Sequence, residues 1–114
     1  MPYLRIEANV DLEKRERQVL LARASALIAR ELGKPERYVM ISLETAKPMC
    51  FAGNDQPLAY LELKSIGLPV AQTPALAKTL CALIEEILAI PTDRTYITFS
   101  DIPRQLWGWN GSTF

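Results

Sequence analysis

Apolar and polar residues alternate in four short segments of the chain. In the first segment Leu4, Ile6 and Ala8 alternate with aromatic or charged neighbours. A period of two is typical of a β-strand that buries one of its faces. The pattern therefore predicts four strands, at Tyr3–Ala8, Tyr38–Glu44, Ala59–Ser65 and Thr95–Asp101.

Two longer segments place apolar residues three or four positions apart, which is the spacing of an amphipathic helix. The first helix is expected to run from an N-cap at Asp11 to Leu32, with Gly33 at the C′ position behind it. The second presents its apolar face from Leu76 to Ile87 and ends before Pro91. Each helix should pack through one face.

These elements form two β-α-β units in sequence order. Within each unit a right-handed helical crossover joins two parallel strands. We therefore expect an α+β (two-layer α/β) fold, in which one four-stranded mixed sheet carries both helices on a single face. Residues 45–58 contain Pro, Gly and Asn, which predicts a loop with a short strand at Cys50 and Phe51. The 114 residues are expected to form one domain, 1–114.

The second face of this sheet is too polar for a core. The pattern places eight residues on it: Arg5, Glu7, Met40, Ser42, Glu62, Lys64, Thr98 and Ser100. The edge strands are also unpaired, which favours an oligomer that brings several sheets together. A monomer with a hydrated sheet face stays open as the alternative. The tail, Trp107–Phe114, has three aromatic residues in eight and is expected to pack on a neighbour or to line a pocket.

Composition and charge exclude several classes of protein. The chain is 49% hydrophobic and 23% charged, with 13 basic and 13 acidic residues, so disorder and nucleic-acid binding are not expected. No run reaches the roughly 20 apolar residues of a membrane span. The first residues lack the apolar stretch of a secretory signal. We therefore expect no membrane association and a cytoplasmic location.

The chain has no histidine, which removes histidine general bases, Ser–His–Asp triads and every His-containing zinc site. Cys50 and Cys81 lie 31 residues apart and are expected to be two buried, reduced thiols rather than a disulfide or a redox centre. No cofactor and no metal are expected. The candidate bases are then carboxylates, lysines, tyrosines and the α-amine. Among them Pro2 differs in chemical kind, because removal of Met1 would expose a secondary amine that titrates near neutrality. A Met-Pro start without any function is the alternative.

Several short motifs occur in a fixed order along the whole chain. They are Met1-Pro2, Gly33-Lys34-Pro35 with Tyr38, Ser65-Ile66-Gly67, Asp93-Arg94-Thr95-Tyr96-Ile97, Gly108-Trp109-Asn110 and Ser112-Thr113-Phe114. In these motifs the chain resembles the macrophage migration inhibitory factor and D-dopachrome tautomerase family of the tautomerase superfamily. The resemblance implies a homotrimer of β-α-β-β-α-β subunits around a central channel. It also implies cofactor-independent keto–enol tautomerase activity on phenylpyruvate-like α-keto acids, with dopachrome tautomerase activity possible.

The resemblance also implies roles for single residues. Pro2 matches the catalytic N-terminal proline, and Lys34 matches the lysine that holds the substrate carboxylate and keeps the proline neutral. Ile66 matches a residue whose backbone N–H meets the substrate. Tyr96 matches a pocket tyrosine of the adjacent subunit. The last matches, Trp109 and Phe114, form an aromatic wall.

The chain departs from the family pattern at other positions. Tyr3 and Trp107 replace smaller or more flexible apolar residues, so a tighter pocket is expected. Thr98 replaces an asparagine that reaches a substrate phenol, which weakens the case for recognition of a ring hydroxyl. Leu58 and Leu61 occupy the positions of the vertebrate C-x-x-C, so no thiol–disulfide oxidoreductase activity is expected. A cytokine-like signalling or binding protein with a vestigial pocket and a receptor partner remains the alternative function.

Overall fold

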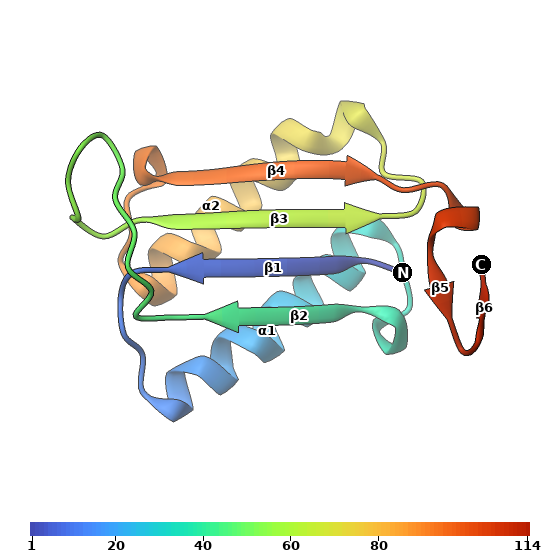
Figure 1. The fold of residues 1–114 in the computed structure, drawn as a ribbon, viewed down its shortest axis with the longest axis horizontal. Helices are drawn as coiled ribbons and strands as arrows, with labels where there is room; N and C mark the ends of the chain where they lie inside the picture. The colour runs from blue at the N-terminus through green and yellow to red at the C-terminus, as the bar shows by residue number, and fades with distance from the viewer.

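The computed structural model describes residues 1–114 and contains one mixed sheet, two long helices and a small C-terminal hairpin. The order along the chain is β1 (Tyr3–Ala8), α1 (Lys14–Leu32), β2 (Met40–Glu44), β3 (Ala59–Ser65), α2 (Thr73–Leu88) and β4 (Thr95–Asp101). The strand order in the sheet is β2-β1-β3-β4 (Figure 1). Strands β1 and β2 are parallel, as are β3 and β4, whereas β1 and β3 are antiparallel. The expected pair of β-α-β units and the mixed sheet are confirmed.

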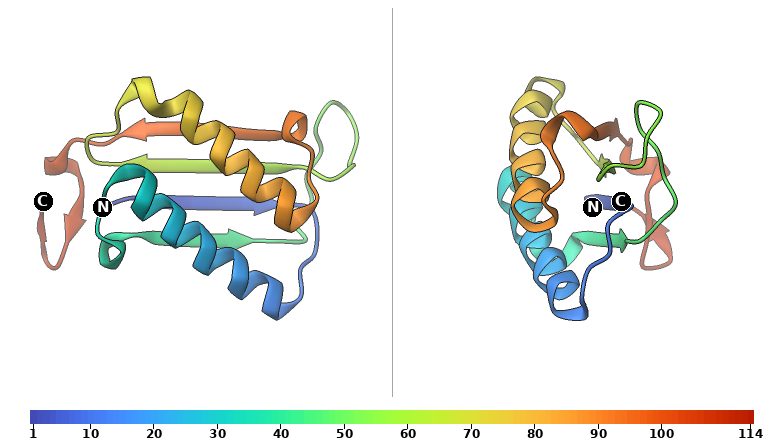
Figure 2. Two further views of the ribbon diagram at one scale, coloured as in Figure 1. Left: turned by 180° about the vertical axis from the view of Figure 1, so that it is seen from behind. Right: turned by 90° about the vertical axis from the view of Figure 1, so that its left-hand side faces the viewer.

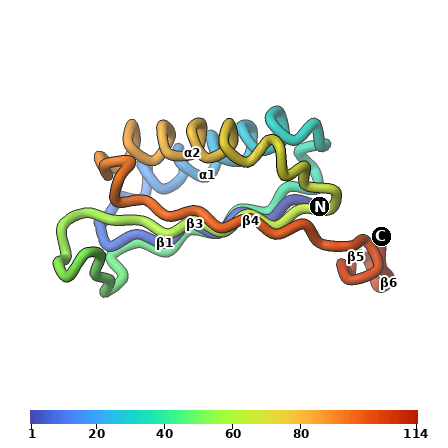
Figure 3. Tube along the Cα trace, turned by 90° about the horizontal axis from the view of Figure 1, so that it is seen from above, coloured from blue at the N-terminus to red at the C-terminus, as the bar shows by residue number.

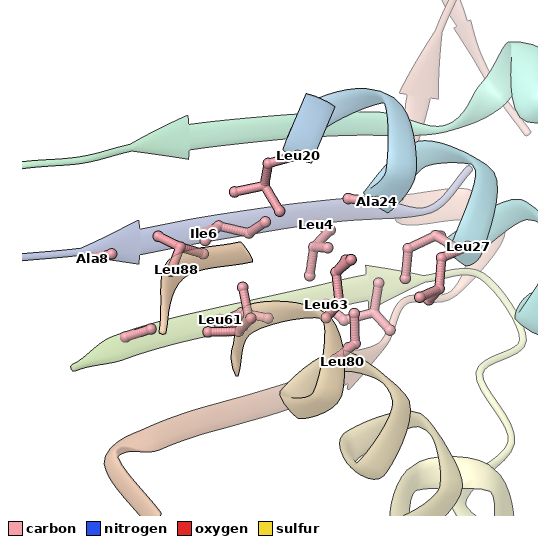
Figure 4. Close-up of a cluster of buried hydrophobic side chains, with 14 of the residues drawn as sticks. Leu4, Ile6, Ala8, Leu20, Ala24, Leu27, Leu61, Leu63, Leu80 and Leu88 are labelled. Carbon is pink, nitrogen blue, oxygen red and sulfur yellow. The ribbon is translucent and has the colours of Figure 1, made fainter. Parts of the chain in front are cut away.

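Both helices lie on one face of the sheet, so the domain has two layers (Figures 2 and 3). The core lies between the layers and contains 18 buried apolar residues. Leu4, Ile6 and Leu61 point from the sheet toward the helices and are fully buried (Figure 4). Each such side chain contributes about 1.5–3 kcal/mol through its burial. This one-sided burial explains the period of two in the strands. No helix is long and apolar enough to cross a membrane.

The first helix begins later than the sequence suggested. Its N-cap is Glu13 rather than Asp11, and the Glu13 N–H donates a hydrogen bond of 3.1 Å to Glu16 Oε1. This capping box satisfies free N–H groups of the first turn. The Asp11 carboxylate instead accepts a bond of 2.9 Å from the Leu12 N–H. Gly33 ends the helix as expected, with a φ of 62° that favours glycine.

Two strand predictions were wrong, one at its start and one altogether. Tyr38 lies in a 3₁₀ turn, Glu36–Tyr38, and β2 begins only at Met40. The Tyr38 N–H donates to the Pro35 carbonyl at 3.0 Å, so it is not available to a sheet. The short strand at Cys50 and Phe51 is absent, because Phe51 makes only an isolated bridge to Asn54 across a tight turn.

Arg94 organises the loop between β2 and β3. Its guanidinium donates to four loop carbonyls at 2.9–3.3 Å, those of Phe51, Asn54, Gln56 and Pro57. The same group lies 5.2 Å from the centre of the Phe51 ring. One half-buried side chain from the 3₁₀ turn Thr92–Arg94, just before β4, thus fixes the shape of this loop.

The tail forms a second, two-stranded sheet that the alternation pattern did not predict. Its strands are β5 (Gly108–Trp109) and β6 (Ser112–Thr113), which are antiparallel. Asn110 and Gly111 join them with φ values of 52° and 77°, as a type I′ hairpin turn requires. The hairpin lies beyond the end of the main sheet, beside both chain termini (Figure 1).

The sheet face away from the helices carries a network of charges. Glu62 accepts contacts from Lys64 at 3.2 Å and Arg5 at 3.5 Å, and Glu7 pairs with Lys47 at 3.1 Å. The contacts from Lys64 and the Tyr60 hydroxyl hold the pKa of Glu62 below its usual range, with a smaller effect from Arg5. The polar character predicted for this face is therefore built from paired charges.

Candidate functional site

A pocket of about 690 Å³ opens where the N-terminus meets the C-terminal hairpin. Three chain segments line most of it: Met1–Tyr3, Arg37–Met40 and Leu106–Trp109. Ser42, Lys64, Ile102 and Phe114 complete the lining. Ten of the 15 lining residues are hydrophobic, so the pocket suits a ligand with an apolar body.

One wall of the pocket is aromatic. The Tyr38 ring meets the rings of Trp109 and Phe114 edge to face, at centroid distances of 5.4 and 5.9 Å. Trp109 and Phe114 stack on each other at 5.3 Å, with an angle of 10° between their planes. Such pairs each contribute about 0.5–1.5 kcal/mol beyond area burial. We call these three residues the aromatic wall. It attaches the tail hairpin to the turn before β2.

The chain's α-amine lies in this pocket. The Met1 ammonium donates a hydrogen bond of 2.9 Å to the Tyr38 carbonyl. Partial burial lowers the pKa of this amine below 8.0, and the positive charge of Lys34 lowers it further. Both causes favour the neutral form, which is the form that acts as a base. Pro2 follows directly, fully buried, and its carbonyl accepts a 3.0 Å bond from the Met40 N–H. This bond fixes the start of β1 against β2.

Lys34 and Ile66 lie near the site but outside the pocket lining. Lys34 follows the helix-ending Gly33, and its N–H donates to the Ala29 carbonyl at 3.0 Å. Ile66 is buried in the turn after β3. The next two N–H groups of that turn donate to Asp101 Oδ1 at 2.9 and 3.1 Å, so Asp101 holds the turn in place.

Tyr96 and Thr98 do not reach the pocket of their own chain. Both lie on edge strand β4, and the Tyr96 side chain is 64% exposed, with its ring 4.8 Å from that of Phe51. The Thr98 hydroxyl lies 2.7 Å from the Tyr60 hydroxyl. Of the residues expected at the site, one chain brings five to the pocket: Pro2, Tyr3, Trp107, Trp109 and Phe114.

The sequence did not assign several lining residues to the pocket. Met40 and Lys64 are the Cα partners of Tyr3 on the two sides of β1, so the strand register brings them to the same end of the sheet. Tyr3 and Ser42 also share a hydroxyl hydrogen bond of 2.7 Å. Met40, Ser42 and Lys64 occupy positions of their strands that face the same side of the sheet as Tyr3. This alternation was the signal in the sequence that could have placed them at the pocket. Arg37 had none, because its position depends on the turn before β2.

Neither cysteine takes part in the pocket. Both thiols are free; Cys50 is exposed and Cys81 is half-buried, so the expectation that both are buried is wrong for Cys50 and only partly met by Cys81. Burial, with a smaller effect from Glu85, raises the pKa of the Cys81 thiol and makes it less reactive. No three His, Cys, Asp or Glu side chains gather as a metal site would need.

Comparison with known proteins gives a consistent family. The family model described as macrophage migration inhibitory factor matches residues 1–114. The chain is 38% identical to a macrophage migration inhibitory factor homolog of Brugia malayi, over 100% of this chain and 99% of that protein. Its fold matches the crystal structure of a macrophage migration inhibitory factor homologue from Prochlorococcus marinus with a TM-score of 0.93 and 47% identity, over 98% of both chains. The structure of the factor from Trichinella spiralis matches with a TM-score of 0.90 and 29% identity, over 98% of this chain and 99% of that one. With the resemblance now shown over its whole length, the chain belongs to the macrophage migration inhibitory factor family.

Proposed function

We propose that this protein is a cofactor-independent keto–enol tautomerase that acts on phenylpyruvate-like 2-oxo acids. The observation that carries the proposal is the position of the chain's amine. It lies in a largely apolar pocket with an aromatic wall, and its pKa is lowered by burial and by Lys34. The lowered pKa of this Met1 amine favours the neutral form, which can accept and return a proton as tautomerisation requires, and Pro2 would carry the chain's amine once Met1 is removed.

In the proposed reaction the base is the secondary amine of Pro2, exposed once Met1 is removed. The neutral amine takes the proton from the enol oxygen, and the resulting ammonium returns a proton to the β-carbon, so no atom is gained or lost. Lys34 and the Ile66 N–H are assigned to the carboxylate and to the developing enolate charge. Fixed positive groups of this kind often supply the largest part of catalysis. The apolar tail of the substrate would contact Tyr3, Trp107 and the aromatic wall.

We further propose that the active unit is a homotrimer. Three features support it: the open charged face of the sheet, the unpaired edges of β2 and β4, and the 64% exposed side chain of Tyr96. In the trimer Tyr96 and Thr98 would line the pocket of the adjacent subunit. This arrangement would place Tyr96 and Thr98 at a pocket, although neither reaches the pocket of its own chain.

Processing of the N-terminus tests the proposed base. Protein with a free Pro2, checked by mass spectrometry, should convert enol-phenylpyruvate to the keto form. Protein that keeps Met1 has an amide at Pro2 and should be slower by about 10²-fold or more, the range of general acid–base catalysis. A processed Pro2→Gly variant, which has a primary amine in a poorer position, should also be slow. Wild-type turnover in that variant would eliminate Pro2 as the base.

A binding role is the second candidate, because curated relatives in animals bear the name macrophage migration inhibitory factor. In that case the outer surface of the protein would carry the function by binding a partner, and the N-terminal amine would have no catalytic role. Absence of turnover in both the processed and the Met1-bearing protein would favour this reading.

A further inference from the structure

The charged side chains that line the pocket are both basic. Its 15 lining residues include Arg37 and Lys64 and contain no Asp or Glu. Both cations are additional to Lys34, which stands outside the lining. A substrate carboxylate held by Lys34 therefore leaves Arg37 and Lys64 able to meet a second negative group, in the case of Lys64 beside its contact with Glu62. Such a site favours a ligand with more than one negative charge.

Lys64 lies on the sheet side of the pocket, near two hydroxyl groups. It is the β3 partner of Tyr3, and the Tyr3 hydroxyl lies 2.7 Å from Ser42 Oγ. We call Tyr3, Ser42 and Lys64 the polar wall. It is distinct from the aromatic wall, so the pocket offers one apolar surface and one surface of hydrogen-bond donors.

The Lys64 ammonium is positioned and still has donors available. It lies 3.2 Å from Glu62 Oε1, and Glu62 is outside the pocket lining. An ammonium has three N–H donors, so one contact with Glu62 leaves two for a ligand. Glu62 is also shared with Arg5 at 3.5 Å and with the Tyr60 hydroxyl at 3.1 Å. The negative charge of Glu62 is therefore shared among three groups and does not fully neutralise Lys64.

Arg37 is in a different situation. Its guanidinium lies over the Tyr38 ring at 4.7 Å, and the residue is exposed. This stacking orders the outer side of the aromatic wall. The Lys64 side chain is 41% exposed, but it lies on the strand next to Tyr3, whose hydroxyl bonds Ser42, and is not stacked on a ring. Of the two lining cations, Lys64 is the better partner for a carboxylate.

We propose that the polar wall is a second anion subsite, and that the preferred substrates are 2-oxo acids with an apolar body and a second carboxylate at the far end. The inference rests on the proposed tautomerase function. The 2-oxo acid end would lie at Pro2 and Lys34. The far carboxylate would accept hydrogen bonds from Lys64 and from the one hydroxyl of the Tyr3–Ser42 pair that does not donate to the other.

A matched pair of substrates tests the subsite. The enols of 4-carboxyphenylpyruvate and 4-carbamoylphenylpyruvate have nearly the same shape and differ in the charge of the para group. The readout is the ratio of their kcat/KM values, in which general damage to the active site cancels. In the wild type the ratio should favour the carboxylate. Lys64→Met should reduce the ratio by about tenfold, the worth of one hydrogen bond between charged groups. Ser42→Ala should reduce it by about threefold.

Arg37→Met is the matched control, because it removes the other lining cation. It should change the ratio by less than about twofold, as expected for a screened surface charge. An unchanged ratio in Lys64→Met would overturn the subsite. Equal losses in both variants would also overturn it, since they would show a diffuse effect of net charge.

Binding measurements separate this proposal from the proposed function. Calorimetry measures the dissociation constants of the unreactive 4-carboxyphenylacetate and 4-carbamoylphenylacetate. The ratio of these two constants is the binding counterpart of the kcat/KM ratio. If no enol is turned over but Lys64→Met weakens binding of the carboxylate selectively, the tautomerase proposal fails and the anion subsite stands. If phenylpyruvate is turned over and neither ratio responds to Lys64, the subsite fails and the tautomerase stands.

Discussion

Replacing Arg94 with methionine should loosen the loop between β2 and β3 and lower the stability of the protein. Arg94 donates four hydrogen bonds to loop carbonyls, two of them at 2.9 Å and two at 3.2–3.3 Å. Hydrogen bonds from a charged donor are worth about 1.5–3 kcal/mol each. The freed carbonyls belong to an exposed loop, where water replaces part of this loss. Counting only the two shorter bonds at the lower value, we expect a loss of about 3 kcal/mol.

For a domain of this size, a loss of about 3 kcal/mol corresponds to a fall in Tm of roughly 10 °C. Thermal unfolding should be followed at a fixed protein concentration, because association between chains raises the apparent stability. Amide hydrogen exchange over residues 51–57 gives the local readout and should become faster. Arg94→Lys keeps the charge without the planar fork of donors, so it should restore only a minor part of the lost stability.

Arg104→Met is the control, since the Arg104 side chain is exposed and makes no hydrogen bond or ion pair. It should change Tm by no more than about 2 °C, in line with substitutions at an unconstrained surface. The reasoning would be refuted if Arg94→Met behaved like this control and left exchange over residues 51–57 unchanged. The loop would then be held by its own turn and not by Arg94.

Two further predictions concern catalysis. Lys34 lowers the pKa of the Met1 amine, and we expect the same effect on the proposed Pro2 amine. In processed Lys34→Met the pKa of that amine should therefore rise, and the acid limb of the kcat/KM profile should move to higher pH; an unmoved limb would exclude this role for Lys34. Dilution should reduce activity per chain as the proposed trimer dissociates, and deletion of Trp107–Phe114 should reduce both assembly and turnover. A fully active monomer by light scattering would contradict the shared pocket.

The strands could be predicted because burial of one face leaves a period of two in the sequence. Leu61 and Leu63 are fully buried, and the glutamate and lysine that alternate with them lie on the open face. Strand ends depend instead on local turns. The Pro35 carbonyl accepts the Tyr38 N–H, which delays β2, and alternation carries no sign of this bond.

The tail hairpin was missed because its strands have two residues each, too few to show a period. The Asn110-Gly111 pair was the available signal, since this dipeptide is typical of a type I′ turn. The pocket was only partly predicted for a related reason. Met40 and Lys64 come together through strand register, and Arg37 through a turn, so each needs the fold before it can be placed.

Both ends of the chain lie at the pocket, with Met1 and Phe114 in its lining (Figure 1). A fusion partner or an affinity tag on either end would therefore be tethered at the pocket mouth, where it could obstruct a ligand. The exposed turn at Ala52–Asn54 lies at the opposite end of the sheet. In the proposed trimer that turn is no better site for a label or an insertion, because the neighbouring Phe51 ring contacts Tyr96, the residue assigned to the pocket of the adjacent subunit. In the proposed trimer both ends of the sheet therefore border a pocket, one in the same chain and one in the adjacent subunit.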